Sequence, residues 1–213
     1  MIIEEIMNTD VATLLPTQTL REAAATLREK KIRHIAVVND ELEVLGVITD
    51  RDIKQATPSN LLDSDDYSVL DTPIEKIMTP NPITGHPLDF VEETATIFYD
   101  NRIGCLPIVS KGKLVGMITE SDMLYKFIEL TGVTQPGSQI EIRVPNKSGV
   151  LFEVSKVFYE HRVNVLSVLV YPDKKDELYK ILVIRVKTIN PLKLVSALEK
   201  EGFDVIWPSH PTL

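Results

Sequence analysis

The chain has 213 residues, a formal charge of −8 and 44% hydrophobic residues, a composition typical of globular proteins. Its length suggests one or two domains, with three small ones also allowed. The single cysteine, Cys105, excludes an internal disulfide framework and a thiolate metal cluster. No apolar run approaches the roughly 18 residues of a membrane span, and the N-terminus lacks the pattern of a signal peptide, so we expect a cytoplasmic protein. The acidic balance argues against nucleic acid as the main partner, because a basic face usually binds it.

The first 129 residues contain an internal repeat. Residues 3–7 (IEEIM) return as residues 74–78 (IEKIM), and residues 46–49 (GVIT) return as residues 116–119 (GMIT). Matching positions stay in register over roughly fifty residues, as repeated units do. We therefore predict two copies of one unit. The predicted segments are copy one over 1–57, an acidic connector over 58–73 and copy two over 74–129.

Each copy is predicted to fold as a helix, a hairpin and a second helix. Apolar residues at helical spacing predict a helix around Leu20 and another from Val91, where Asp89 is the expected N-cap. A short helix is expected to begin near Asp50 in one copy and near Glu120 in the other. Such a unit leaves one sheet face uncovered, so we expect the copies to pack about a pseudo-twofold axis. The predicted strands cover 34–38, 44–48, 106–109 and 114–118.

The connector carries an acidic run at Asp63, Asp65 and Asp66. We interpret it as a solvated linker. A metal-binding loop is the alternative, because hard cations prefer oxygen ligands, although the spacing matches no known calcium loop.

A break at residues 135–138 (QPGS) ends the repeated part and lies in a predicted linker over 130–138. The elements expected beyond it follow the order βαββαβ, which predicts a ferredoxin-like sandwich over 139–213. They are a strand over 140–144, a helix with its apolar face at 150–158, strands over 163–171 and 178–187, a helix from Asn190-Pro191 to Gly202, and a strand over 203–207.

Recognisable catalytic motifs are absent from the sequence. There is no nucleophile elbow and no P-loop, and Cys105, in an apolar strand, is predicted to be a buried thiol. We therefore predict no catalytic residue, no metal site, no cofactor and no enzymatic activity. None of the histidines has the spacing of a metal site; they are His34, His86, His161 and His210.

The pattern Gly-x-x-Thr-x-x-Asp occurs twice, each time where a predicted strand meets a predicted helix. A helix N-terminus offers unpaired N–H groups that suit a phosphate, and a threonine hydroxyl can add another donor. A carboxylate only accepts, so it suits the hydroxyls of a ribose. Thr49 with Asp52, and Thr119 with Asp122, could thus hold the sugar-phosphate part of a nucleotide. The alternative is that both pairs only cap their helices.

The repeated part resembles the cystathionine-β-synthase (CBS) domain pair. That resemblance implies a regulatory module whose clefts bind adenosine-containing ligands such as AMP or ATP. It also implies that residues of the first and second strands frame the base and that basic residues reach the phosphates. The likeness is carried by the two strand pairs and by Met7, Met78, Gly46, Thr49, Asp52, Gly116, Thr119 and Asp122.

Carried over position by position, the resemblance gives a candidate nucleotide site in each copy. The first copy has basic residues where the second has Gly104, Cys105 and Ser121. We therefore expect the first cleft to be the stronger nucleotide site and the second to prefer a less charged ligand or to be empty. The implied nucleotide-binding residues are Thr13, Arg33, His34, Ile35, Thr49, Arg51, Asp52, Thr84, Leu106, Thr119 and Asp122.

Residues 139–207 resemble an ACT domain, a small regulatory fold that commonly binds amino acids at dimer interfaces. The likeness consists of the βαββαβ order and the loop with Asn146, Gly149, Val150 and Leu151, which is the implied effector loop. The family often has Asp-x-Pro-Gly there, and this chain has Asn146 for Asp and Ser148 for Pro. The alternative is that Asn146 and Gly149 only shape a turn.

The whole chain is similar to the acetoin utilization protein B family, which implies a link to acetoin or butanediol breakdown. The fold class expected is α+β: a tandem CBS pair followed by a ferredoxin-like ACT domain. We expect a non-catalytic regulatory homodimer that binds an adenine nucleotide, and also, at the ACT domain, an amino acid. A regulator of this kind is also compatible with an unidentified protein partner. The alternatives are a ligand-free interaction scaffold and a regulatory subunit of a separate enzyme.

Overall fold

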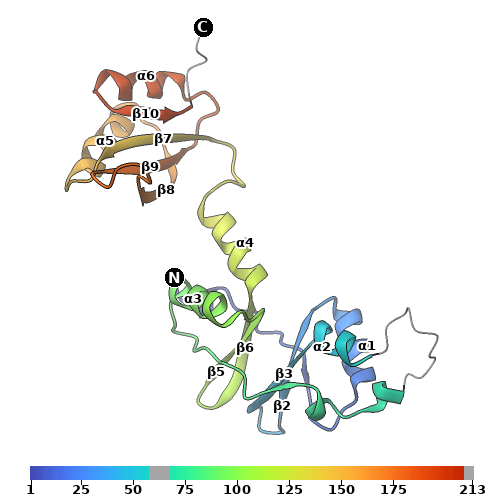
Figure 1. The fold of residues 1–213 in the computed structure, drawn as a ribbon. Helices are drawn as coiled ribbons and strands as arrows, with labels where there is room; N and C mark the ends of the chain where they lie inside the picture. Colours follow the sequence, from blue (N-terminus) through green and yellow to red (C-terminus); the bar gives the residue numbers. More distant parts are fainter. Residues whose placement is uncertain (58–67, 209–213) are drawn as a thin grey trace. The chain divides into compact units, whose positions relative to one another are not determined.

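A computed structural model describes residues 1–57 and 68–208 and divides the chain into two compact units, Met1–Leu124 and Tyr125–Leu213 (Figure 1). Most of the predicted acidic connector, including Asp63, Asp65 and Asp66, lies outside the described residues, and so does the metal-binding alternative for it. Within the described part, no helix has the length and apolar character needed to cross a membrane.

The first repeat has the predicted order of helix, hairpin and helix. Strands β2 and β3 pair antiparallel, and two short edge strands complete a sheet in the order β1-β2-β3-β4. The predicted helix around Leu20 and the predicted strand pair are confirmed. The elements are β1 (Thr13–Leu14), α1 (Leu20–Lys30), β2 (His34–Val38), β3 (Val44–Thr49), α2 (Asp50–Ala56) and β4 (Thr79–Pro80).

The second repeat follows the same plan. Strands β5 and β6 pair antiparallel, and single bridges from Gly85 to Ile108 and from Asn8 to Met117 stand where the first repeat has β1 and β4. Its elements are α3 (Val91–Asn101), β5 (Cys105–Ser110), β6 (Lys113–Thr119) and α4 (Glu120–Leu130).

The predicted cap of α3 is wrong. The N-cap is Phe90, and no side chain caps this helix start. Asp89 instead accepts a hydrogen bond from the backbone N–H of His86 at 2.7 Å, while its own carbonyl accepts one from Ile3 at 2.9 Å. The carboxylate therefore stabilises the loop before the helix.

The segment that begins each repeat packs into the core of the other repeat. Ile3 is fully buried beside Val91 and Phe98 of the second repeat, and Ile74 is fully buried near Leu20 of the first. This exchange joins the two repeats through their cores. The short 3-10 helices that begin the repeats are Ile3–Glu5 and Ile74–Lys76, and another covers Ser68–Asp71.

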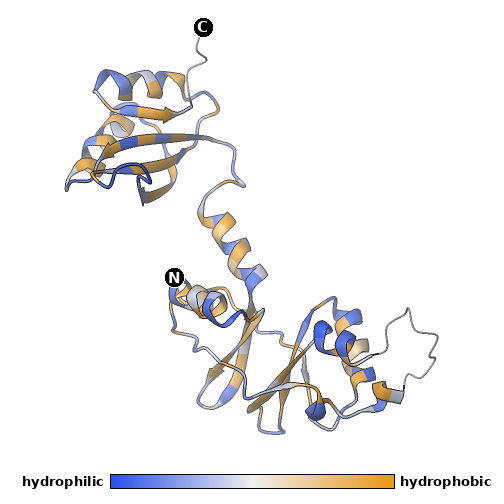
Figure 2. Cartoon of the chain, in the orientation of Figure 1, coloured by the Kyte–Doolittle hydropathy of each residue, from blue (hydrophilic) through white to orange (hydrophobic). Residues whose placement is uncertain are grey.

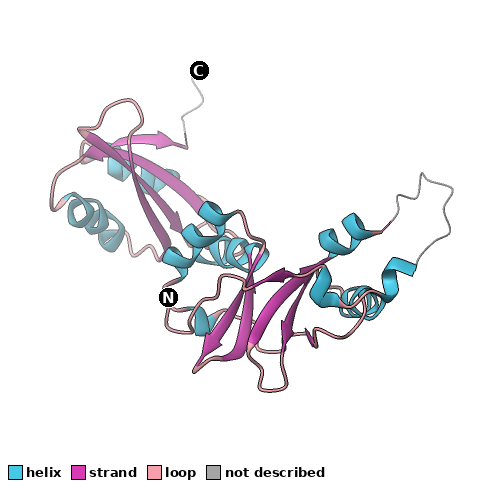
Figure 3. Ribbon diagram, turned by 60° about the horizontal axis from the view of Figure 1, so that its bottom comes forward, coloured by secondary structure: helices cyan, strands magenta, loops and turns pink. Residues whose placement is uncertain are grey.

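The sheets of the two repeats pack against each other, as the pseudo-twofold prediction requires. Ala36, Val38 and Val47 of the first repeat form one buried cluster with Cys105 and Met117 of the second. Figure 3 shows the strands of the two repeats side by side in this unit. Because each Å² of buried apolar surface contributes about 25 cal/mol, this contact stabilises the pairing of the two repeats.

The second unit contains the predicted βαββαβ order. Its four antiparallel strands have the order β10-β7-β9-β8, and both helices contribute to one core with the sheet. Figure 2 shows hydrophobic residues along the strands of both units. The elements are β7 (Ser138–Pro145), α5 (Val150–Glu160), β8 (Val165–Pro172), β9 (Tyr179–Val186), α6 (Leu192–Lys200) and β10 (Asp204–Trp207).

The alternation predicted for β7 is confirmed, because Ile140, Ile142 and Val144 are fully buried in this core. Helix α6 begins one residue later than predicted. Its N-cap is Pro191, and the side-chain oxygen of Asn190 accepts a hydrogen bond from the N–H of Leu192 at 3.2 Å.

Candidate functional site

Both Thr–Asp pairs form capping boxes at the starts of their helices. In the first, Asp52 Oδ2 accepts hydrogen bonds from Thr49 N at 2.8 Å and Thr49 Oγ1 at 2.7 Å, and Asp52 N donates to Thr49 Oγ1 at 3.2 Å. In the second, Thr119 and Asp122 make the same bonds at 2.8, 2.7 and 3.3 Å. The helix-capping role of both pairs is thus real.

Capping leaves part of each carboxylate available. All the bonds to Asp52 and Asp122 use Oδ2, and among the described residues no hydrogen bond engages Oδ1. Each threonine hydroxyl already donates its proton to the aspartate, so in this arrangement it can only accept from a ligand. A capping aspartate can therefore still receive a ribose hydroxyl.

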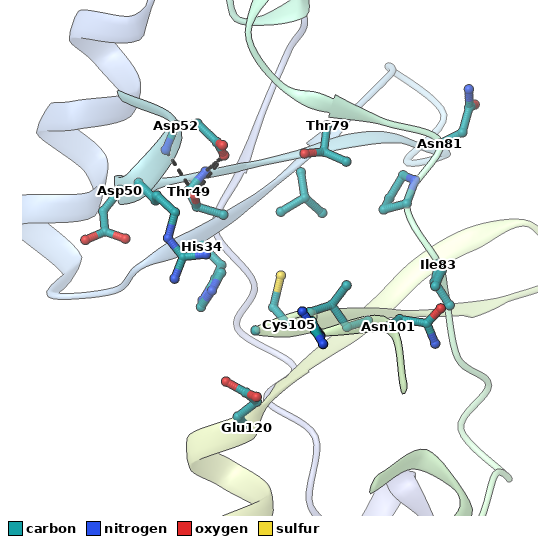
Figure 4. Close-up of a pocket in the computed structure, with 16 residues that line it drawn as sticks. His34, Thr49, Asp50, Asp52, Thr79, Asn81, Ile83, Asn101, Cys105 and Glu120 are labelled. Carbon is teal, nitrogen blue, oxygen red and sulfur yellow. Dashed lines mark hydrogen bonds between the residues drawn. The ribbon is translucent and has the colours of Figure 1, made fainter. Parts of the chain in front are cut away.

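The first cavity, of about 460 Å³, lies at the Thr49–Asp52 start of α2. In Figure 4 these two residues face Cys105 of the second repeat across the space, with Thr79 and Asn81 on a further side. The walls thus come from both repeats. The first repeat supplies the capping box, and the second supplies the segment after Met78 and residues 101–105.

The second cavity, of about 670 Å³, is built in the same way with the repeats exchanged. Its capping box is Thr119 with Asp122, and the opposite wall is residues 31–34 of the first repeat. Asn8, which follows Met7, takes the place that Thr79 has in the first cavity.

The two cavities share a wall made of five residues. At its centre, a Cβ atom on Gly104 would lie only 2.9 Å from His34 Nε2, so the imidazole fills the space that the glycine leaves. Bulk at either residue would therefore alter both cavities. The shared residues are His34, Asp50, Arg51, Gly104 and Glu120.

Burial sets the protonation of two wall residues. Desolvation lowers the pKa of His34 below its usual value, opposed in part by the charge of Asp50. Burial raises the pKa of Cys105 from 9.0 to about 12, which keeps this thiol protonated. A hydrogen bond from Lys54 at 2.9 Å lowers the pKa of Asp50 and holds it as a carboxylate. The first cavity is therefore lined by neutral side chains at His34 and Cys105 and by a charged carboxylate at Asp50.

The structure brings together only some of the nucleotide-binding residues implied by the sequence. Neither of these cavities is lined by Thr13, Ile35, Thr84 or Leu106. Ile35 and Leu106 are fully buried in the cores of their repeats, because their side chains point to the helix side of the sheet. The predicted residues that line at least one cavity are Arg33, His34, Thr49, Arg51, Asp52, Thr119 and Asp122.

Arg33 lies in a different cavity from the one expected. The sequence suggested that it accompanies Asp52 in the first cleft, but it lines the second cavity with Asp122. The reason is that each cavity is closed by the helix–strand connection of the opposite repeat.

Sequence reasoning missed the basic residues at the ends of the first helix of each repeat. Lys31 and Arg102 both follow their helix in a left-handed conformation, with φ of 53°, and they line the second and first cavity, respectively. Lys31 and Arg102 are 71 residues apart, which is the offset between the repeats. Their equivalent positions were the signal in the sequence that could have identified them.

The implied ACT effector loop is split between core and surface. Val150 is buried in the core, while Asn146 and Gly149 are exposed and Leu151 is about half exposed. Gly149 has a φ of +84°, which favours glycine, and it is the N-cap of α5. The turn-shaping alternative therefore has a structural basis at Gly149.

Within the described part of the chain, no three His, Cys, Asp or Glu side chains lie close enough to hold a metal ion.

The family models match both parts of the chain. The CBS domain model matches residues 3–59 and 74–129, and the ACT domain model matches residues 138–203. This chain therefore belongs to the CBS domain family, with a tandem CBS pair followed by an ACT domain.

Two curated relatives differ in how much of their length is matched. A CBS domain-containing protein of Dictyostelium discoideum is 30% identical over 142 residues, covering 64% of this chain and 98% of that protein. Homoserine O-acetyltransferase of Methanococcus vannielii is 32% identical over 123 residues, covering 57% of this chain but only 24% of the enzyme. The chain thus spans about a quarter of that enzyme's length.

Two solved structures share the fold of the repeated part. The crystal structure of a Vibrio cholerae protein named for acetoin utilization (AcuB) has a TM-score of 0.55 at 30% identity, covering 63% of this chain and 95% of that one. The CBS domain pair of protein MJ0100, in complex with 5′-methylthioadenosine and S-adenosyl-L-methionine, has a TM-score of 0.52 at 26% identity, covering 60% and 95%.

Proposed function

We propose that this protein is a non-catalytic regulator whose CBS pair binds adenosine-type ligands in its two cavities. The observation that carries the proposal is the pair of matched cavities, each with a Thr–Asp capping box from one repeat and a wall from the other. The complex of protein MJ0100 with two adenosine-type molecules supports this ligand class.

The chemistry of each cavity suits a nucleoside. The free Oδ1 of Asp52 or Asp122 accepts hydrogen bonds from ribose hydroxyls, and apolar side chains such as Ile83 and Ile103 in the first cavity contact the base. Because each cavity contains parts of both repeats, a ligand that favours one arrangement of the repeats shifts their equilibrium. Regulation then requires that the partner's affinity differ between the two arrangements.

We further propose that the ACT domain binds an amino acid near Asn146 and that the protein acts in acetoin or butanediol breakdown. The likeness to the Vibrio cholerae protein supports this context. A second candidate is a regulatory subunit of a separate enzyme, and it is favoured by the similarity to part of a homoserine O-acetyltransferase.

A homodimer is part of the same proposal. Strand β8 lies at the edge of the ACT sheet, and Val168, Leu169 and Val170 on it are exposed. An exposed apolar edge strand invites pairing with another chain, and a twofold contact is the commonest solution. Light scattering at micromolar concentration should give twice the mass of one chain, and cross-links should join the Asn146–Leu151 loops of two copies. A monomer mass would contradict the dimer.

The decisive experiment for ligand binding separates a ligand contact from a helix cap. Asp52→Ala should weaken binding of adenosine, 5′-methylthioadenosine or AMP at the first cavity by roughly 10- to 100-fold, because a hydrogen bond to a charged group contributes about 1.5–3 kcal/mol. Titration calorimetry on the full chain measures this change, and Asp122→Ala tests the second cavity in the same way.

The chain offers a matched capping control. Thr19 and Glu22 form the same capping box at the start of α1, and neither residue lines the two cavities. Glu22→Ala should lower the melting temperature, as Asp52→Ala does, without changing ligand affinity. An affinity equal to that of the wild type in all three aspartate and glutamate variants would reject the ribose contact, whereas no binding to the wild type would favour the ligand-free scaffold.

A further inference from the structure

The boundary between the two compact units falls inside helix α4. The first unit ends at Leu124 and the second, which contains the ACT domain, begins at Tyr125, whereas α4 continues from Glu120 to Leu130. The equivalent helix of the first repeat, α2, has 7 residues against 11 and ends at Ala56, within the first unit. Of the two helices that begin at a cavity, α4 is thus the one that continues into the ACT unit (Figure 1).

The start of α4 belongs to the second cavity. Thr119 and Asp122 form its capping box and line that cavity, so a ligand that bonds to Asp122 contacts the cap of this helix directly. A capping side chain stabilises a helix start because it satisfies N–H groups that have no partner within the helix. A ligand that holds this carboxylate in place therefore also stabilises the first turn of α4.

The segment that follows α4 is held by two side chains of the ACT sheet. Ser167 Oγ donates a hydrogen bond to the carbonyl oxygen of Thr131 at 2.8 Å. Arg185 Nη2 donates to the carbonyl oxygens of Gln135 at 3.0 Å and Val133 at 3.4 Å. Ser167 and Arg185 are cross-strand partners on β8 and β9, and we call this pair the α4 clamp. The predicted linker over 130–138 is therefore fixed to the sheet where it begins.

Close packing at Gly132 supports the same attachment. This glycine is buried with a φ of +67°, and a Cβ atom on it would lie 3.2 Å from Leu166 Cβ and 3.5 Å from Arg185 Cδ. The Nε atom of Arg185 is buried as well, and among the described residues no hydrogen bond engages it. The side chain of Arg185 therefore packs against the turn that ends α4 and does not extend freely into solvent.

Helix α4 has little packing of its own to stabilise it. None of its 11 residues is buried, and the side chains of Tyr125, Phe127 and Leu130 are each more than half exposed. A helix of this length without tertiary packing is marginal in water. The capping box in the first unit and the α4 clamp in the second therefore stabilise the same helix from its two ends.

We propose that α4 couples ligand binding in the second cavity to the ACT unit, with Ser167 and Arg185 as the positioning residues of this coupling. The inference rests on the proposed adenosine site and adds the route by which one of its two cavities acts on the rest of the chain. A ligand that stabilises the start of α4 also strengthens the attachment at its end, and the effect is reciprocal because both equilibria share one coupling free energy. The first cavity lacks this route, since α2 ends within the first unit.

The test measures the reciprocal effect by titration calorimetry on the full chain, with adenosine as the probe. Asp52→Ala leaves the second cavity intact, and Asp122→Ala leaves the first. Adding Ser167→Ala and Arg185→Met to the Asp52→Ala variant should weaken adenosine binding about fivefold, at the lower end of the couplings usual between two sites. The same pair in the Asp122→Ala variant should change it less than twofold. Because neither clamp residue lines the two cavities, a lost ligand contact cannot explain a selective effect.

Hydrogen exchange measures the forward effect. Saturating adenosine should slow amide exchange in β8 of the wild type and of Asp52→Ala, and it should not do so in Asp122→Ala or when the α4 clamp is removed. Arg143→Met is the matched control, because it removes an arginine from β7 of the same sheet, where Arg143 bonds to Asp173 at 2.6 Å. This control should keep both the affinity and the exchange response.

Thermal melting checks that the clamp variants fold. If the double substitution unfolds the ACT unit, Ser167→Ala alone removes one hydrogen bond and should give a smaller effect of the same sign, confined to the second cavity.

The outcomes separate this inference from the function on which it rests. If adenosine does not bind the wild type, the proposed adenosine site is wrong, and the inference is wrong with it. If adenosine binds but the clamp substitutions affect both cavities equally or neither, the coupling through α4 is overturned and the adenosine site stands. The same conclusion follows if Asp52→Ala, and not Asp122→Ala, abolishes the exchange response of β8.

Discussion

The two repeats share a framework but differ on the walls that face their cavities. Each has a capping box of Thr and Asp with nearly the same hydrogen-bond distances. On the walls of the cavities, by contrast, the first repeat has Arg33 and His34 where the second has Gly104 and Cys105.

This difference shows which positions the fold fixes. The Thr–Asp helix starts and the strand contacts must satisfy the same backbone groups in both repeats, so their residues stay similar, although the starts of α1 and α3 differ in their caps. A cavity wall makes no such demand, so its charge can diverge without cost to the framework. The predictions below test this division between framework and wall.

The largest expected effect concerns Cys105, the wall residue equivalent to His34. A pKa raised from 9.0 to about 12 lowers the thiolate fraction near neutral pH by roughly a thousandfold. Alkylation by iodoacetamide at pH 7.5 should therefore be far slower in the native protein than in urea, where the thiol is exposed. Equal rates in both conditions would show that the wall is open at this position.

The next effect tests the framework at its two equivalent core residues. Ile35 and Leu106 are each fully buried, so replacing either by Ala should cost about 2–5 kcal/mol of unfolding free energy. Urea denaturation followed by circular dichroism measures both losses. Leu88→Ala, at a side chain that is 62% exposed, is the control and should change little. A large loss in only one repeat would contradict the shared framework.

Much of the fold could be predicted from sequence, because its signals are local. The apolar strands and the βαββαβ order arise from patterns within short segments, and the repeat offset is found by comparing such segments with one another. The exchange of Ile3 and Ile74 between the repeat cores could not be predicted, because it depends on packing between segments far apart in the sequence, such as Ile3 with Val91 and Ile74 with Leu20. Asp89 has the residue type of a cap, but a competing loop hydrogen bond uses its carboxylate.

The candidate site was predicted in part for the same reason. The motif identified Thr49, Asp52, Thr119 and Asp122 because a capping box is a local pattern. It did not assign Arg33 to the correct cavity, because each cavity combines one repeat's capping box with the other repeat's wall.

A smaller effect is expected at the glycines of the strands β3 and β6. A Cβ atom on Gly46 would contact Met78 and lie 3.0 Å from the carbonyl oxygen of Thr79, and one on Gly116 would contact Met7. Because a backbone atom cannot move aside cheaply, Gly46→Ala and Gly116→Ala should each cost about 1–3 kcal/mol. Urea denaturation measures both, with Glu93→Ala on the exposed face of α3 as the control. A neutral result at one glycine would mean that the two methionine contacts are not equivalent.

The smallest effect is the pH dependence that His34 adds to the first repeat only. Burial lowers the pKa of His34 in the folded state, while Asp50 and Glu120 act to raise it and Arg33 and Arg51 act to lower it further. As the pH falls below about 6.5, the unfolded chain binds a proton that the folded chain does not. The stability that the neutral imidazole contributes is therefore complete above pH 6.5 and is lost as the pH falls toward the lowered pKa.

Melting temperatures between pH 7.5 and 5 should show this loss, and His34→Gln should reduce its slope because glutamine does not titrate. Cys105, at the equivalent position, stays protonated throughout this range, so this position of the second repeat adds no pH dependence to the stability. A slope unaffected by His34→Gln would mean that this imidazole is solvated in the folded protein, unlike the buried thiol of Cys105 at the equivalent position.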